Sequence, residues 1–350
     1  MTVLETEPRS AAGPVVTALR GGAAGAGPRL VWGLYALGTA LLALLLLAVR
    51  LDDYWLNIII LTYLFAGLAA GWNIIGGFGG QLSLGHGVYF AIGAYTVGIT
   101  YVRYGWSPWL SALLAVPLAC AVAALTSWPT FRLRGPFFAM ATLALNQVAL
   151  VLALYFKDVT GGPTGVTISF VPSLRDVAFV ERWKYGVLVL VFVAAAVAIA
   201  TGISRSRLGY ALRAVREDDE AAAAVGFNVF WTKMKGMLVS AAVTSIGGSI
   251  YAVYIRYLDP GSVLSLADVS VRFVLICLLG GIGTVLGPVL GALVFIPGVT
   301  LLQAELSGQA PGLNLVAVGA LLVLIPLLLR RGIVGTTAQL LRRGTARWER

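Results

Sequence analysis

Long apolar stretches without a charged residue alternate with short polar segments along the whole chain. These stretches occupy 54–102, 104–131, 135–156, 186–204, 236–255, 273–304 and 306–329. A helix needs about 20 apolar residues to cross a bilayer, so they predict, with the apolar segment at 30–49, eight to ten membrane helices. The expected spans are 31–49, 54–75, 86–102, 109–128, 136–156, 184–202, 236–256, 272–303 and 312–329. The pattern is typical of an all-α polytopic membrane protein.

Glycine and proline interrupt two of these stretches in a similar way. One segment reads GGFGGQLSLGHGVYFAIGAY from Gly76, and the other reads GGIGTVLGPVLGALVFIPG from Gly280. Interrupted segments at matching places in two halves are typical of duplicated transporter folds. We therefore predict two related halves, with chance similarity in a chain of 42 glycines as the alternative. The long 272–303 stretch is expected to split into two short segments or to re-enter the membrane.

The composition supports a membrane protein and excludes other classes. The chain is 59% hydrophobic and 11% charged, with a mean hydropathy of +0.89, which excludes a soluble enzyme, a disordered chain and a disulfide scaffold. Basic residues concentrate in the loop 203–235 and in the tail, so we expect the arm 1–29, this loop and the tail 336–350 to be cytoplasmic. They flank and interrupt a transmembrane domain at 30–335. The net charge of +10 then faces anionic lipid, and no nucleic-acid partner is expected.

The chain lacks the residues that several kinds of chemistry require. It contains no Gly-Lys pair, and hence no phosphate-binding loop that ends in Gly-Lys-Ser/Thr. Its single histidine, His86, excludes a multi-histidine metal site, so we expect neither metal nor cofactor in this chain. No charged residue lies at the centre of an expected span, which argues against proton-coupled carriers and membrane enzymes. We expect a translocation path formed by small residues, backbone and neutral polar groups.

Neutral polar side chains among glycines are the candidates for that path or its gate. Unwound backbone is tolerated inside a membrane where it lines a cavity or is buried in protein. The candidates are Gly79, Gly80, Gln81, Ser83, His86, Asn146, Gly280, Gly281 and Gly283. Close helix packing is the competing explanation of the glycines. For His86 a structural role is favoured over a functional one, and for Asn146 the two readings are evenly balanced.

The loop 203–235 is predicted to contain a short amphipathic helix. Apolar residues recur at helical spacing at Leu208, Leu212, Val215, Ala222 and Val225, and Gly226 provides a C-terminal stop. Arg213/Glu217 and Arg216/Glu220 are spaced to pair on its outer face. A helix that lies on lipid carries bulky apolar residues and mostly basic charge. The alanines at 221–224 and the four acids at 217–220 instead favour docking on another protein.

Several motifs in order make the sequence similar to a known family. They are GGQLSLGHGVYFAIGAYT at 79–96, RLRGPFFAMATLA at 132–144, TGGPTGV at 160–166, SRLGYALRAVREDDEAAAAVGFNVFWTKMKGMLVSAA at 206–242, DPGSV at 259–263, GGIGTVLGPVLGA at 280–292 and RRGIVG at 330–335. Over about 55–335 the chain resembles the integral-membrane permease subunits of bacterial branched-chain amino-acid ABC importers, the second of the two paired permeases. The arm at 1–29 lies outside the resemblance.

The resemblance implies partners and a transport mechanism. A second similar permease, two cytoplasmic ATPases that use ATP and Mg²⁺, and a periplasmic or lipid-anchored binding protein would complete an inner-membrane importer. The loop 203–235 would couple to an ATPase, through Arg213, Arg216, Glu217, Asp218, Ala221, Ala222 and Gly226. The expected activity is inward transport of a small amino acid, of branched-chain type, by alternating access. The alternatives are an ABC importer for urea or short amides and an ion-coupled secondary carrier.

Overall fold

The computed structural model describes residues 28–49, 52–133, 135–306, 319–320, 332–334 and 336. It divides into one unit up to Leu45 and a second unit from Leu46 onward. The predicted arm, apart from residues 28–29, the span at 312–329, apart from residues 319–320, and the tail beyond residue 336 lie outside the described residues. In the first unit the described residues belong to the helix α2 (Pro28–Val49), and all other elements belong to the second.

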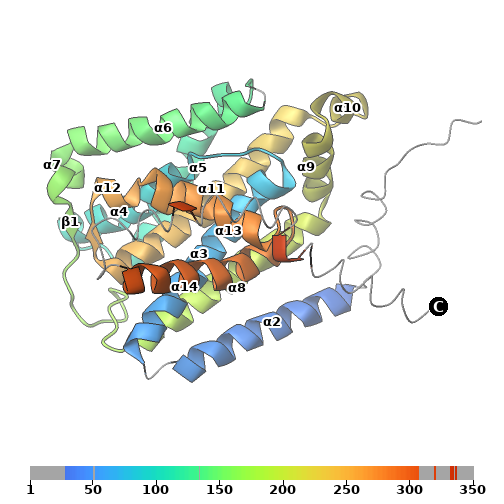
Figure 1. Cartoon of the computed structure of the whole chain (residues 1–350). Coiled ribbons are helices and arrows are strands. Elements are labelled where there is room, and N and C mark those ends of the chain that lie inside the picture. The colour runs from blue at the N-terminus through green and yellow to red at the C-terminus, as the bar shows by residue number, and fades with distance from the viewer. Residues whose placement is uncertain are drawn as a thin grey trace, which may run out of the picture. The chain divides into compact units, whose positions relative to one another are not determined.

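Helices make up nearly all of the second unit (Figure 1). The elements are α3 (Asp53–Asn73), η1 (Ile74–Phe78), α4 (His86–Tyr104), α5 (Pro108–Thr130), α6 (Pro136–Tyr155), α7 (Lys157–Thr160), η2 (Gly162–Thr164), β1 (Val166–Thr167), α8 (Arg182–Arg205), α9 (Arg207–Glu217), α10 (Asp219–Ala224), α11 (Val229–Ile255), β2 (Tyr257–Leu258), α12 (Pro260–Val263), η3 (Leu266–Val271), α13 (Arg272–Gly280) and α14 (Gly287–Leu306). The segments η1 and η3 are π-helical.

Seven helical stretches in the described part of the chain are long and apolar enough to cross a membrane. They are α3 with η1, α5, α6, α8, α11, the run from α12 to α13, and α14. The expected all-α polytopic fold is therefore confirmed. The stretch 272–303 is divided, as predicted, because α13 ends at Gly280 and α14 begins at Gly287.

The core of the second unit surrounds α3. This helix packs against α8, α11, α13 and α14, while α4 and α5 pack against α11. Glycines let backbones touch: a β-carbon on Gly93 of α4 would overlap the carbonyl of Ser245, and one on Gly248 of α11 would overlap that of Phe90. By contrast, α6 contributes few buried side chains, namely Phe138, Thr142 and Asn146.

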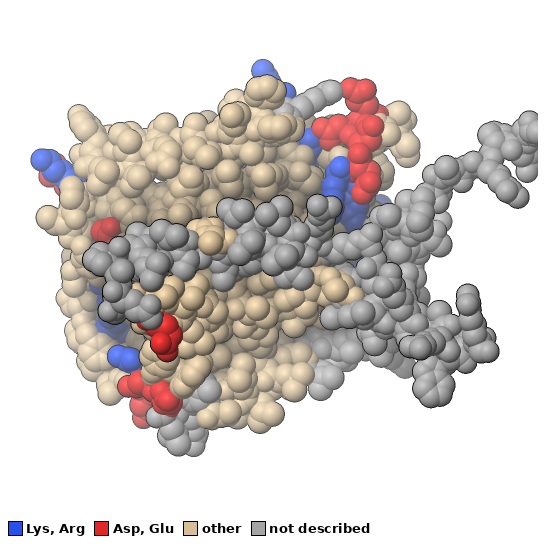
Figure 2. Space-filling view, in the orientation of Figure 1, with Lys and Arg blue, Asp and Glu red and all other residues tan. Residues whose placement is uncertain are grey.

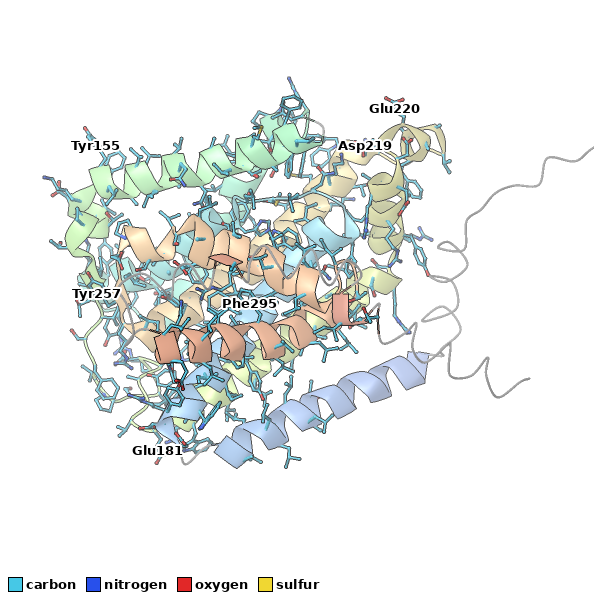
Figure 3. The ribbon with its side chains drawn as sticks, in the orientation of Figure 1. Tyr155, Glu181, Asp219, Glu220, Tyr257 and Phe295 are labelled. Carbon is cyan, nitrogen blue, oxygen red and sulfur yellow. The ribbon has the colours of Figure 1, made fainter. Side chains whose placement is uncertain are left out.

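Charged side chains gather at the two ends of these helices, with an uncharged band between them on the face shown in Figure 2. One end holds α9, α10 and the turn between α13 and α14. The other end holds the 156–181 segment and a short antiparallel ladder, in which Val166 pairs with Leu258. Figure 3 shows Asp219 and Glu220 at the first end, and Tyr155, Glu181 and Tyr257 at the second. There, hydrogen bonds from Trp183 and Lys184 lower the pKa of Glu181.

The loop 203–235 differs from its predicted form, because it holds two helices in place of one. The chain is extended at Asp218, with φ −160° and ψ 121°, and this separates α9 from α10. The Asp218 carboxylate accepts the backbone N–H groups of Glu220 and Ala221, so it starts α10 as an N-cap. In the same way Asn228 caps α11, which therefore begins at Val229, seven residues before the expected span.

Candidate functional site

The helix α9 lies on a surface made by glycines. Leu212 packs against Gly79 and Gly236, where added β-carbons would lie 3.2 and 3.1 Å from its Cδ2. Gly80 has φ +67°, and a β-carbon there would lie 2.7 Å from Cγ of Arg216. Gly79 and Gly80, two of the predicted path residues, therefore contact α9. Whether they also line a path stays a prediction. We call α9 and α10 together the coupling segment, after the role that the resemblance predicts for the loop 203–235.

Arg216 connects α9 to the interrupted end of α3. The last turn of a helix leaves carbonyl groups without helical partners, and a cation nearby interacts favourably with them. Arg216 Nη1 donates to the Gly77 carbonyl in η1 at 2.7 Å. Arg213 makes a different contact, donating to the Ser204 carbonyl at the end of α8 at 2.7 Å. Both arginines therefore bond backbone carbonyls, where the sequence suggested pairing with acids four residues on.

Asn73 brings the two glycine-rich segments together. Its Oδ1 accepts the Gly283 N–H at 2.9 Å, and its Nδ2 donates to the Thr284 carbonyl at 2.8 Å. Gly283 has φ +76°, and a β-carbon there would lie 2.5 Å from Arg216 Nη1. Gly281 also has a positive φ, of 123°. The matching segments at 76–80 and 280–284 thus meet beside Arg216, at a place that we call the glycine junction.

Close packing explains Gly280, another predicted path residue. A β-carbon on Gly280 would overlap the Gly287 carbonyl and would lie 2.9 Å from the Gly291 nitrogen. The end of α13 can therefore approach the start of α14 only because this position has no side chain. The tight turn between the two helices follows from this contact.

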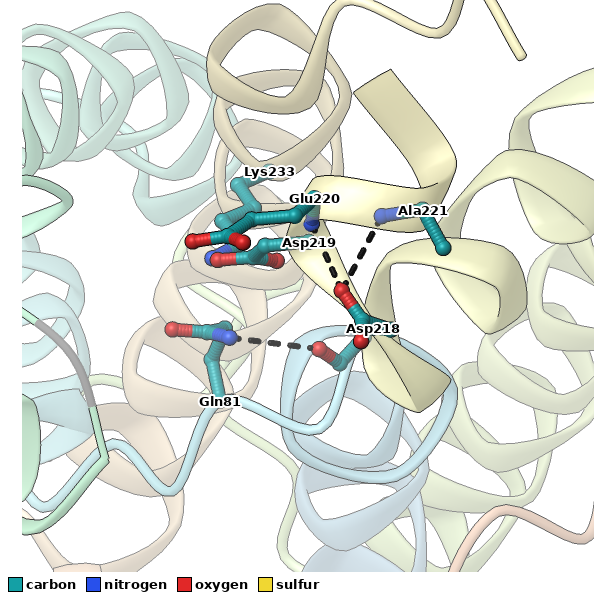
Figure 4. A network of polar contacts seen from close by, with 7 residues as sticks. Gln81, Asp218, Asp219, Glu220, Ala221 and Lys233 are labelled. Carbon is teal, nitrogen blue, oxygen red and sulfur yellow. Dashed lines mark hydrogen bonds and ion pairs between the residues drawn. The ribbon is translucent and has the colours of Figure 1, made fainter. Parts of the chain in front are cut away.

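The acids of the coupling segment surround a shallow hollow of about 350 Å³ (Figure 4). Lys233 of α11 is buried and forms an ion pair with Asp219 at 2.7 Å, which fixes α10 on α11. Gln81 also lines the hollow, and its Nε2 lies 3.4 Å from the Gly79 carbonyl. Among the described residues no cluster of His, Cys, Asp and Glu could hold a metal ion.

Apolar and small side chains of the coupling segment are exposed on the outer surface of α9 and α10. Ala222 is buried, whereas Ala221, Ala223 and Ala224 are exposed. Beyond them Val225 is 80% exposed, and Gly226 has φ +97°, in agreement with the predicted helix stop. Tyr210, Phe227 and Trp231 add further exposed apolar area. Exposed aromatic side chains are of the kind enriched at interfaces between proteins.

His86 has a structural environment. Its ring is fully buried and lies between Ser83, at 2.9 Å from Nδ1, and Ser240, at 2.8 Å from Nε2. Ser240 Oγ donates to the Gly71 carbonyl at 2.8 Å, so it accepts a hydrogen bond from Nε2. His86 is therefore the Nε2–H tautomer, and Nδ1 accepts from Ser83. This network ties α4 to α3 and α11, as expected for a satisfied core histidine.

Side chains satisfy the non-helical backbone at 79–85. Trp72 Nε1 donates to the Ser83 carbonyl at 2.8 Å, and Leu84 N–H donates to Thr142 Oγ1 at 3.0 Å. At the start of α4, Gly87 N–H donates to Ser270 Oγ at 2.9 Å. Such partners allow an unwound segment inside a membrane protein. Asn146, a fourth polar group nearby, is buried and donates from Nδ2 to the Leu264 carbonyl at 2.9 Å.

An apolar cavity of about 190 Å³ lies between α4, α5, α6 and α11. Its wall includes Tyr89, Val122, Thr126, Thr142 and Met237. The predicted path residues lie outside this wall. The structure therefore separates them into the glycine junction, the His86 network, the Asn146 contact and the hollow beside Gln81.

Sequence reasoning missed Asn73, Ser240 and Thr284, on which these contacts depend. Asn73 had a usable signal, because it is a polar residue in a charge-free span directly before the first glycine-rich segment. Ser240 and Thr284 had none, since small hydroxyl residues are common in membrane helices and often bond only their own backbone.

Comparison with known proteins identifies the family. The family model described as the permease component of branched-chain amino acid transport systems matches residues 54–326, more than half of the chain. The chain belongs to this permease family. The permease is 28% identical to the LivM high-affinity branched-chain amino acid permease of Escherichia coli K12, over 85% of this chain and 75% of that protein. It is a multi-pass inner-membrane protein and a transport component of the ABC class.

Two further relatives extend the comparison. The LivH permease of Escherichia coli K12 is 23% identical over 77% of this chain and 91% of that protein. The nucleoside ABC transporter permease NupC of Lactococcus lactis is 26% identical over 67% of this chain and 77% of that protein. No solved structure matches the permease significantly.

Proposed function

We propose that this permease moves a small amino acid of branched-chain type inward by alternating access, driven by ATP hydrolysis in two partner ATPases. ATP and Mg²⁺ bind in those partners, and this chain holds no cofactor. A second permease related to LivH pairs with it, and a periplasmic or lipid-anchored binding protein delivers the solute at the end that holds the 156–181 segment. The end that holds α9 and α10 faces the cytoplasm, as do both termini.

The surface of α9 and α10 is the observation that carries this proposal. It places Glu217, Ala221 and Val225 on the outside of the unit, while Asp219 and Lys233 fix it from behind. It lies at one end of the apolar helices, where a soluble protein can reach it. An ATPase docked there would contact a segment that is hydrogen-bonded directly to the interrupted end of α3.

The uncharged spans support passage of the solute in place of tight binding. An amino acid is a zwitterion, and burying a charge without a partner is costly. Neutral groups along a path form no ion pair with the ammonium or the carboxylate group of the amino acid. Tight binding of the solute is then a property of the external binding protein. One relative is named for branched-chain amino acids and another for nucleosides, so similarity alone does not identify the solute. Direct uptake competition therefore has to identify the solute.

The first experiment is to purify the tagged permease from its native membrane in mild detergent. We expect a second permease and two ATPases to accompany it. Reconstituted with ATP and the binding protein, the complex is expected to take up leucine, isoleucine or valine, with competition by these and not by urea or short amides. A lone permease that transports without ATP would contradict the proposal and favour an ion-coupled carrier.

Substitution in the coupling surface tests its role separately. Because Ala222 is buried, the exposed Glu217 and Ala221 are the better sites. The double variant Glu217→Arg/Ala221→Leu should lose uptake and ATPase association while the permease stays in the membrane. The control is Asp158→Lys, an exposed charge reversal at the opposite end, which should keep its ATPases. Normal association in the double variant would remove this surface from the proposal.

A further inference from the structure

The interrupted end of α3 needs an external hydrogen-bond donor. The π-helical turn η1 ends at Phe78, and Gln81 N–H returns to the Ile75 carbonyl of η1 at 3.1 Å, so this donor does not reach the Gly77 carbonyl. Arg216 supplies the donor to the Gly77 carbonyl. The bond is assisted by the positive charge, and such bonds are stronger than neutral ones. A residue of the coupling segment therefore completes the end of a central membrane helix.

The same guanidinium group touches the second glycine break. Gly283 lies so close to Arg216 Nη1 that no side chain fits between them. Asn73, one turn before Gly77, holds the backbone at Gly283 and Thr284. Three hydrogen bonds thus connect α9, α3 with η1, and the turn between α13 and α14.

The aliphatic part of Arg216 adds a steric restraint. It packs on Gly80, whose positive φ and missing side chain let α9 approach this closely. One turn earlier, Leu212 is enclosed between Gly79 and Gly236. Because both contacts are tight, a displacement of α9 toward the glycine junction would cause overlap, and a displacement away from it would break the bond from Arg216 to Gly77. Motion of α9 is therefore transmitted to the junction in both directions.

We propose that Arg216 is a positioning residue that makes both glycine breaks follow the coupling segment. When α9 moves, the ends of α3 and α13 move with it, so both interrupted helices change together. The inference rests on the proposed function and specifies where the coupling motion enters the membrane helices. Arg213 does not do this, because its bond returns to Ser204, at the end of the continuous helix α8.

Arg216→Gln is the decisive variant, with Arg216→Lys as the conservative replacement. Arg207→Gln is the matched control, since it removes the same charge from the exposed first residue of α9. In the assembled transporter, loss of one charge-assisted bond should reduce uptake in Arg216→Gln by about tenfold or more. ATP hydrolysis should stay near that of the unmodified complex, so that fewer solute molecules move per ATP. Arg216→Lys should restore part of the uptake, and Arg207→Gln should behave like the unmodified complex.

Hydrogen exchange on the purified permease supplies a readout that does not depend on ATPases. Amides at 77–81 and 281–286 should exchange faster together in Arg216→Gln, and neither should change in Arg207→Gln. Unchanged uptake, or a parallel fall of uptake, ATP hydrolysis and membrane abundance, would overturn the inference. Faster exchange in only one of the two segments would also overturn it. If the unmodified permease has no ATPase partner, the proposed function itself fails, and the co-purification shows this independently.

Discussion

The helices α3 and α6 carry the same kind of sequence and occupy opposite environments. Both are free of charges over more than 18 residues, and both are apolar enough to cross a membrane. Each span contains an 18-residue apolar window. In α3 with η1, 94% of that window is buried, whereas in α6 only 22% is buried. Apolar character therefore identifies a span without indicating its neighbours, because lipid and protein interiors are equally apolar.

Small and polar residues mark the difference between the two helices. Along α3, Gly67 lies against Phe192 of α8 and Gly71 lies against Val243 of α11. Along α6, the buried side chains follow one stripe, and bulky side chains such as Val151 and Tyr155 are exposed elsewhere on the helix. A helix that fits among other helices needs close approaches, whereas a helix at the edge needs only one line of contact.

The largest effect is expected from filling a close approach in α3. In Gly71→Leu the new side chain would collide with Val243, since even a β-carbon lies 2.8 Å from its Cγ1. Overpacking of this kind should cost about 3 kcal/mol or more in stability. Thermal unfolding in detergent measures it. The control is Gly202→Leu in α8, where no atom lies within 4 Å of an added β-carbon. Equal melting temperatures for the two variants would mean that α3 is not packed as described.

An intermediate effect is expected from the hydrogen bonds that hold α3 and α4 on α11. Ser240→Ala removes the partner of His86 Nε2, whereas the Gly71 carbonyl keeps the Ile74 N–H. Leaving the His86 N–H unsatisfied costs about 1–3 kcal/mol. The matched control is Ser245→Ala in the same helix, because Ser245 Oγ donates only to the Ala242 carbonyl of its own helix. The melting temperature should fall for Ser240→Ala alone, and an equal fall in both would contradict the network.

The smallest effect is expected at the edge helix α6. Asn146→Leu removes the bond to the Leu264 carbonyl at nearly constant volume. Polar contacts between membrane helices average about 0.6 kcal/mol, so the isolated permease should lose about that much. The control Gln147→Leu changes the exposed neighbour on α6 and should be neutral in the isolated permease. Gln147→Leu could instead destabilise only the assembled transporter. That result would show that a partner subunit covers α6, and the difference in burial between α6 and α3 would then be smaller in the complex.

Much of the architecture could be predicted from the sequence. The charge-free stretches located α3, α4, α5, α6 and α8 to within a few residues at each boundary, and the glycine pattern located the break before α14. The helical content of the loop 203–235 was predicted, but its division at Asp218 was not, because the apolar spacing on both sides fits one helix. The early start of α11 was missed because a lysine such as Lys233 is typical of a loop. Only the structure shows that its charge is paired with Asp219.

The candidate site was predicted less completely. The sequence indicated the glycines and His86, yet it could not separate a path from packing, because glycine serves both. The structure shows that Gly79 and Gly80 contact α9 and that His86 bonds Ser83 and Ser240. These pairs are distant along the chain, and their contacts arise only when the helices pack together.

By itself, the sequence determined which segments are apolar enough to cross a membrane, that the loop 203–235 holds amphipathic helical structure and which family the chain resembles. These properties follow from composition, spacing and motifs that a single stretch of chain contains. The tertiary structure alone decided that α3 is central and α6 peripheral, and that two glycine-rich segments, joined by a hydrogen bond between residues 210 positions apart, meet beside Arg216. The reason is that hydrophobicity determines the medium of a helix, whereas its neighbours depend on the shape of surfaces that form only when all helices are in place.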